Sequence, residues 1–109
     1  MSSPASSSAE GQALLRQFQA LDTEGRQSLL SQWIDAPDAA QVEALMAAAS
    51  DADDTVRLLS LQTLAELAAP EALAVVIAAL DDPRATLREA AASALAGYRD
   101  GPHAKQLLA

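Results

Sequence analysis

The feature of this 109-residue chain that most constrains its fold is an internal repeat. At an offset of 31 residues, with no gaps, the stretch DADDTVRLLSLQTLAEL superimposes on DPRATLREAAASALAGY. The matched pairs are Asp51 with Asp82, Thr55 with Thr86, Arg57 with Arg88, Leu64 with Leu95, and, upstream, Val42 with Leu73, Leu45 with Val76 and Met46 with Ile77. Units this short cannot hide their own apolar faces, so we expect them to stack around one elongated core.

Each unit is predicted to be a pair of helices. Apolar residues recur at spacings of three and four, and the core-forming residues are mostly alanine and leucine, which favour helix. The spacing of Asp38 and Gln41 predicts a capping box, and Pro70 fits the first position of a helix. We expect about seven helices: pairs at about residues 10–35, 38–68 and 70–98, and a short C-terminal helix at 102–108.

These helices are expected to form one domain, residues 10–109. Residues 1–9, MSSPASSSA, contain no Lys or Arg and no apolar run, so they do not read as a signal peptide and are predicted to be a disordered tail. No stretch approaches the roughly 18 apolar residues of a membrane span.

At the repeated residues the chain resembles the HEAT repeat family, in particular the phycobilisome-lyase type of HEAT-like repeat. The resemblance covers about residues 38–98. It rests on an aspartate-bearing turn, an apolar residue followed by arginine early in the second helix, and a remainder rich in alanine and leucine. The pair at 10–35 is expected to be a divergent first repeat without that arginine. The resemblance implies an all-α fold, a short right-handed α-solenoid of stacked antiparallel helix pairs.

The segment DADDTVR offers two interpretations, a cation site or a joint between helices. An EF-hand loop that began at Asp51 would need glycine at its sixth position and glutamate at its twelfth, where this chain has Val56 and Gln62. We therefore predict a joint, in which Asp53 or Asp54 caps the following helix.

The arginine of each unit is expected to brace neighbouring turns through a carboxylate, and Arg88 is predicted to pair with Asp51 or Asp82. An anionic ligand bound by the two arginines is the alternative. The predicted structural residues are Asp51, Asp54, Arg57, Asp82 and Arg88.

Charge and composition exclude several functional classes. The formal net charge is −8, so the surface field opposes nucleic acid and anionic lipid. There is no cysteine, and His103 is the lone histidine, so we expect no metal, no cofactor and no catalytic residues. The missing cysteines agree with a reducing compartment, and a cytoplasmic location is expected.

The candidate partner-binding residues lie on the second helices of two adjacent units. If Val56 and Leu64 face the core, Leu58, Leu61 and Gln62 point to the concave side. We predict a partner surface made of Leu58, Leu61, Gln62, Glu89 and Ser93. The alternative is that the helix at 54–68 is central and buried all round.

The function that follows is a non-enzymatic protein–protein interaction module or adaptor, whose partner is a helix or peptide with apolar anchors and some basic residues. Two alternatives remain. By analogy with HEAT-like lyases, the chain could be a subunit of an enzyme that handles bilin chromophores. It could also self-associate into a homo-oligomer through Leu107 and Leu108.

Overall fold

The computed structural model describes the backbone of residues 3–100 and the side chains of residues 9–98. This part of the chain holds six α-helices, two short 3₁₀-helices and no strand, which confirms the predicted all-α fold. The elements are α1 (Ser3–Ala20), α2 (Thr23–Asp35), η1 (Ala39–Gln41), α3 (Val42–Ala48), α4 (Asp54–Leu67), η2 (Pro70–Ala72), α5 (Leu73–Ala79) and α6 (Ala85–Asp100). The predicted helix at 102–108 lies outside the described residues.

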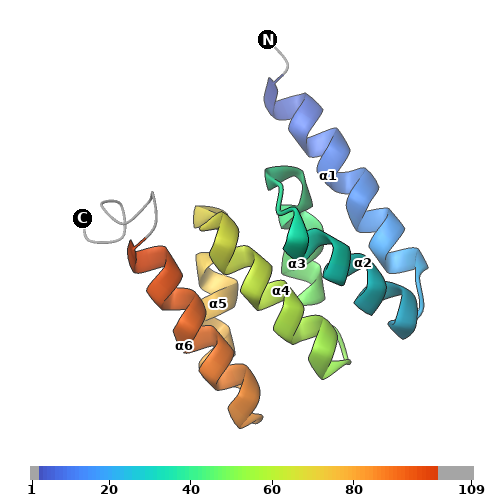
Figure 1. Ribbon diagram of the computed structural model, residues 1–109. Helices are drawn as coiled ribbons and strands as arrows, with labels where there is room; N and C mark the ends of the chain where they lie inside the picture. The colour runs from blue at the N-terminus through green and yellow to red at the C-terminus, as the bar shows by residue number, and fades with distance from the viewer. Residues whose placement is uncertain (1–2, 101–109) are drawn as a thin grey trace.

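The helices form a stack of pairs. Helices α2, α4 and α6 make one layer with α4 in the middle, and α3 and α5 lie behind that layer (Figure 1). Helix α1 packs against α3 and η1 at one end of the stack. Successive pairs therefore share their faces, as the repeat predicts.

Two clusters of buried side chains fill the stack, and α4 contributes to both. Val56 and Leu64 belong to the first cluster, together with Leu30, Trp33 and Leu45. The second cluster lies between α4, α5 and α6 and consists of Leu61, Ala68, Val76, Leu87, Ala94 and Tyr98. Because α4 has a neighbour on either side, its apolar residues are buried over more than one stripe.

Polar groups at the helix ends hold the loops in place. The predicted capping box is present: Asp38 accepts a hydrogen bond from the Ala40 N–H, and Gln41 Oε1 accepts one from the Asp38 N–H. At the far end of the stack the buried Tyr98 hydroxyl donates to the Ala69 carbonyl at 2.7 Å. This bond ties α6 to the turn that follows α4.

Helix α1 begins at Ser3, ahead of the boundary predicted at residue 10. The backbone of residues 3–9, which we expected to be a tail, is therefore helical. Two properties allow this extension. Lengthening an existing helix needs no new nucleation step, since each added residue gains a hydrogen bond. Pro4 lies in the first turn, where a backbone N–H would have no partner within the helix, so its missing N–H costs nothing.

Candidate partner-binding groove

The joint between α3 and α4 is built on Asp51 and Asp53. The Asp51 carboxylate accepts from the Asp53 N–H at 2.9 Å and from the Arg26 guanidinium at 2.7 Å. Asp53 caps α4 by accepting from the Val56 N–H at 2.9 Å, and the Gln27 side-chain amide donates to it at 3.0 Å. The bond from Gln27, followed by that from Val56, lowers the pKa of the Asp53 carboxyl below its ordinary value.

The third aspartate of the segment, Asp54, has a different role. It forms an ion pair with Arg84 at 2.8 Å, and both side chains are about half exposed, at 55% and 49% respectively. The pair links the start of α4 to the turn before α6. At this exposure water weakens it strongly.

The joint recurs one unit later, between α5 and α6. Asp82 accepts from the Arg84 N–H at 2.8 Å and forms an ion pair with Arg57. We call the two ion pairs, Arg26 with Asp51 and Arg57 with Asp82, the turn clamps. In each clamp the aspartate lies 25 residues after its arginine and its side chain is at most 7% exposed. Each clamp therefore joins one unit to the next.

Arg26 is a residue that the sequence analysis missed. We expected the first helix pair to lack the arginine of the repeat, and this was wrong. The available signal was the period itself, because the 31-residue offset that joins Arg57 to Arg88 also joins Arg26 to Arg57. In the structure the Arg26 guanidinium also lies 4.7 Å from the centre of the Phe18 ring and donates to the Phe18 carbonyl.

The predicted pairing of Arg88 with a carboxylate of Asp51 or Asp82 is wrong. Arg88 donates to the main-chain carbonyl of Asp82 at 2.7 Å, while Arg57 holds the Asp82 carboxylate. The reason is direction: a clamp arginine reaches forward to the turn of the following unit, and Asp82 precedes Arg88 in the chain.

A groove of about 620 Å³ runs between α4 and α6. It is lined by Leu58, Gln62, Ala65 and Glu66 from α4, by Thr86, Glu89, Ala90, Ser93 and Ala94 from α6, and by Ile34 from α2. Four of the five predicted partner-binding residues, Leu58, Gln62, Glu89 and Ser93, thus lie on one surface. Near Ala65, Gly97 of α6 packs against α4, where an added Cβ would lie in ordinary contact with the Ala65 carbonyl oxygen, at 3.4 Å.

Leu61, the fifth predicted residue, is not on this surface. Its side chain is 1% exposed and belongs to the second core cluster. Leu61 lies about 60° around the helix from Leu58, by the geometry of an α-helix, and that rotation turns it under α6. For Leu61 the buried alternative is correct, whereas Leu58 is partly exposed and forms part of the groove.

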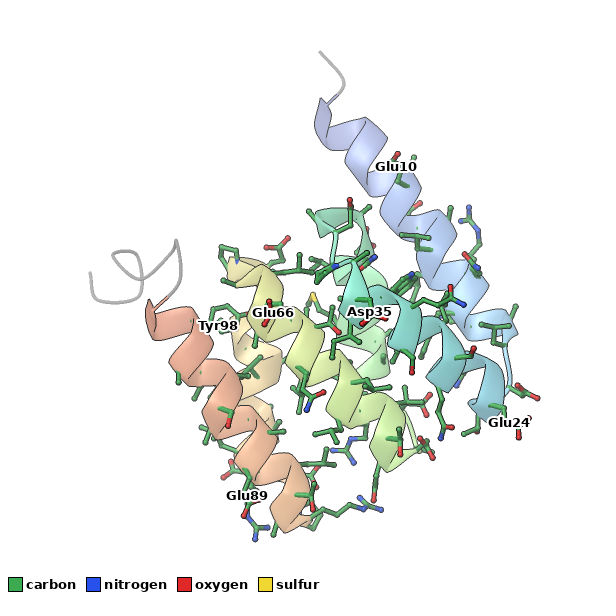
Figure 2. All side chains as sticks on the ribbon, in the orientation of Figure 1. Glu10, Glu24, Asp35, Glu66, Glu89 and Tyr98 are labelled. Carbon is green, nitrogen blue, oxygen red and sulfur yellow. The ribbon has the colours of Figure 1, made fainter. Side chains whose placement is uncertain are left out.

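The groove is negatively charged. Glu66 and Glu89 are exposed and project from α4 and α6 toward opposite ends of these helices (Figure 2). Among the side chains of residues 9–98, the arginines that pair with carboxylates are Arg26, Arg57 and Arg84, and each does so at a turn. The charges of Glu66 and Glu89 are therefore not neutralised by an ion pair within the described part of the chain.

Within residues 9–98 no three His, Asp or Glu side chains gather closely enough to hold a metal ion. In the same part of the protein no helix has the length and apolar character needed to cross a membrane.

The stacked pairs, the periodic turn clamps and the groove on the layer of second helices define an α-helical repeat protein. The family model for HEAT repeats matches residues 42–109, more than half of the chain, and the protein belongs to that family. The match is to HEAT repeats in general and does not distinguish the phycobilisome-lyase type. HEAT repeats generally mediate protein–protein interactions. Searches of curated proteins and of solved structures found no match.

Proposed function

We propose that this protein is a non-enzymatic interaction module that binds a protein or peptide partner in the groove between α4 and α6. The observation that carries the proposal is the combination, in one groove, of apolar lining residues with two exposed carboxylates that no arginine of the described region neutralises. A soluble partner that buried the apolar residues would exclude water from them.

The chemistry of the groove indicates the kind of partner. Leu58, Ala65 and Ala90 offer a shallow apolar floor, and Glu66 and Glu89 lie toward its two ends. A short amphipathic helix with one or two apolar anchors and a Lys or Arg on either side would match this arrangement. Each exposed charge pair contributes only about 0.2–1 kcal/mol, so the carboxylates act mainly on the association rate and the choice of partner.

The same lining argues against catalysis as the role of this groove. Among the described side chains, its polar groups are the Gln62 amide, the two glutamates and the hydroxyls of Thr86 and Ser93, and no histidine, lysine or cysteine of residues 9–98 lines it. A hydroxyl nucleophile needs an adjacent base that a third group orients, and no such arrangement is formed by these side chains.

The test begins with peptides selected from a random phage-displayed library against the full wild-type chain. Their binding is then measured by fluorescence anisotropy against Glu66→Lys/Glu89→Lys and against the matched control Glu10→Lys/Glu24→Lys, which changes the net charge by the same amount on α1 and α2. We expect selected peptides to carry basic residues and to lose at least tenfold in affinity only with the groove variant.

A neutral variant separates shape from charge. Ser93 is exposed and lines the groove, so Ser93→Trp should fill it without disturbing the core. We expect this variant to bind the selected peptides weakly while its circular dichroism stays that of the wild type. Peptides that bind both groove variants as well as they bind the wild type would show that the partner surface lies elsewhere.

A further inference from the structure

The turn clamps have a direction, and the last arginine of the series lies at the end of the described stack. Arg26 and Arg57 each reach the aspartate 25 residues further along the chain. Arg88 stands at the same position of the repeat, one period after Arg57. Within residues 9–98 its guanidinium has no carboxylate partner, and it turns back to the main-chain carbonyl of Asp82.

The surface beside Arg88 is apolar. Ile77 is 49% exposed and Leu80 is 36% exposed, and they are the large hydrophobic residues that stay exposed in the described part of the chain. Helix α5 itself, Leu73–Ala79, has no polar side chain, although the net charge of the protein is −8. Covering these two side chains would remove apolar surface from water and so be favourable.

The repeat shows which way this surface faces. One period earlier, Leu80 corresponds to Ala49, which lines a cleft of about 410 Å³ together with Val75 and Ala78 of the next unit. Ala92 corresponds to Leu61, which is buried against that same unit. Arg88 corresponds to Arg57, which lines the same cleft as Ala49, and Ile77 corresponds to Met46, which lines a pocket that includes Glu71 of that unit. These residues therefore face the space that a further helix pair would occupy. We call Ile77, Leu80, Arg88 and Ala92 the end face.

We propose that the end face docks a helix pair of a partner protein that carries an aspartate in the turn between its helices. The partner's apolar helix would cover Ile77 and Leu80, and its aspartate would complete a third turn clamp with Arg88. Charge complementarity supports an acidic turn in the partner. In both clamps of this chain the guanidinium pairs with a carboxylate whose side chain is at most 7% exposed, and Arg88 would pair with the partner's aspartate in the same way. The proposal concerns a surface apart from the groove and does not depend on the groove's function.

Two other occupants lack a carboxylate at the clamp position. In a second copy stacked head to tail, the position one period before Asp51 is Ala20. The aspartate of its α1–α2 turn, Asp22, corresponds to Asp53 and caps α2 by accepting from the Gly25 N–H. Residues 101–109, GPHAKQLLA, include no aspartate or glutamate side chain. A partner with an acidic turn is the occupant that fits the position of Arg88.

The experiment presents the end face with a helix pair of known chemistry. Residues 70–109 are repeated after Asp100, which adds one further unit in register and places the duplicate of Asp82 at the clamp distance from Arg88. Covalent attachment raises the effective concentration of the docking unit, so even weak docking becomes visible. We expect the extended chain to unfold in one cooperative transition with a higher Tm than the parent chain.

Substitutions then locate the contact. In the extended chain we expect Arg88→Ala and alanine at the duplicate of Asp82 each to lower Tm by about 5–10 °C. If both residues form one clamp, the second substitution should add less than half of its own shift. Arg84→Ala is the matched control, since Arg84 pairs with the exposed Asp54, and its effect should be the same in both chains and fully additive.

Several results would overturn the proposal. A separate unfolding transition of the added unit, an extended chain that does not fold, or additive effects of the two clamp substitutions would show that the end face does not accept such a pair. Dimerisation of the native chain that Ile77→Asp abolishes would make a second copy the occupant. Faster hydrogen exchange of the α5 amides in a chain ending at Asp100 would make residues 101–109 the occupant. We expect a monomer and unchanged exchange.

Discussion

Replacing Asp82 with alanine tests whether the turn clamps hold the stack together. The Asp82 carboxylate is 3% exposed, pairs with the Arg57 guanidinium and accepts from the Arg84 N–H. Alanine removes both acceptors at once and leaves Arg57, whose side chain is only 19% exposed, without its anion. Because these groups are mostly buried, water cannot fully replace the missing carboxylate as it would at the surface.

The expected change in the free energy of unfolding combines two terms. Losing a charge-assisted hydrogen bond costs about 1.5–3 kcal/mol, and losing the neutral bond in the turn costs about 0.5–1.5 kcal/mol. Because Arg57 keeps some contact with water, we expect a total of about 3 kcal/mol, toward the lower end of the range for breaking a fully buried ion pair. In a domain of this size that lowers Tm by roughly 10–20 °C.

Urea denaturation followed by far-UV circular dichroism measures this change, provided that the m-value stays that of the wild type. Asp82→Asn keeps an acceptor for the Arg84 N–H but not the charge, so it should cost about half as much. Arg84→Ala breaks an ion pair that is half exposed and should cost less than about 1 kcal/mol.

Two results would refute this reasoning. If Asp82→Ala cost no more than Arg84→Ala, the buried clamp would add nothing over an exposed pair. If Arg57→Ala and Asp82→Ala were additive, the two side chains would not be coupled, whereas a clamp predicts a coupling energy of about 1–3 kcal/mol.

Three further predictions concern single positions. Ala68 follows the last residue of α4 and has φ 47°, in the left-handed region, where alanine is strained. Ala68→Gly relieves this strain but removes a buried methyl group, so the free energy of unfolding, measured in urea, should rise by up to about 1 kcal/mol. A lower free energy of unfolding would show that the methyl contact outweighs the strain. The pKa of the Asp53 carboxyl is lower in the folded protein than its ordinary value of 3.8, so the ionised carboxylate stabilises the fold. This stabilisation is present above pH 3.8 and is lost as the pH falls through the pKa of the folded state. Asp53→Asn, which keeps a capping side chain, should therefore make acid unfolding less steep in this range, and an unchanged acid limb would contradict this assignment. Burial, and to a smaller extent the charge of Glu71, raises the pKa of the Tyr98 hydroxyl from its ordinary value of 10 to about 12. The neutral hydroxyl therefore stabilises the folded protein below pH 10, and this stabilisation is lost as the pH rises from 10 through about 12. Tyr98→Phe should cost about 1–2 kcal/mol at neutral pH by leaving the Ala69 carbonyl without its donor, and should remove that alkaline loss; equal stability at neutral pH would mean that water replaces the hydroxyl.

Local signals predicted the helices well. The capping box of Asp38 and Gln41, the proline at position 70 and the apolar spacing each act within one or two turns, so they can be read from neighbouring residues. The left-handed end of α4 at Ala68 had no such signal. Ala68 is buried in the second core cluster, and the Ala69 carbonyl that follows it accepts from the Tyr98 hydroxyl, so this turn is tied to contacts with α6 and not to a local sequence signal.

The candidate site was predicted in part. Leu58, Gln62, Glu89 and Ser93 were placed on one surface because the 31-residue period and the helical repeat together define a face. Leu61 was assigned to that face wrongly, since helical spacing gives the angle between side chains but not the position of the neighbouring helix that covers one of them.

The sequence by itself determined the units of this protein: their number in the matched region, their helical character and the arginine and aspartate that recur in each. The tertiary structure alone decided how these units join, namely that Arg26 clamps Asp51, that Arg57 clamps Asp82, and that Arg88 is left at the end face. The physical reason is range. Helix propensity and capping act over a few residues, whereas a clamp joins side chains 25 residues apart and forms only when stacking brings one turn within reach of the next.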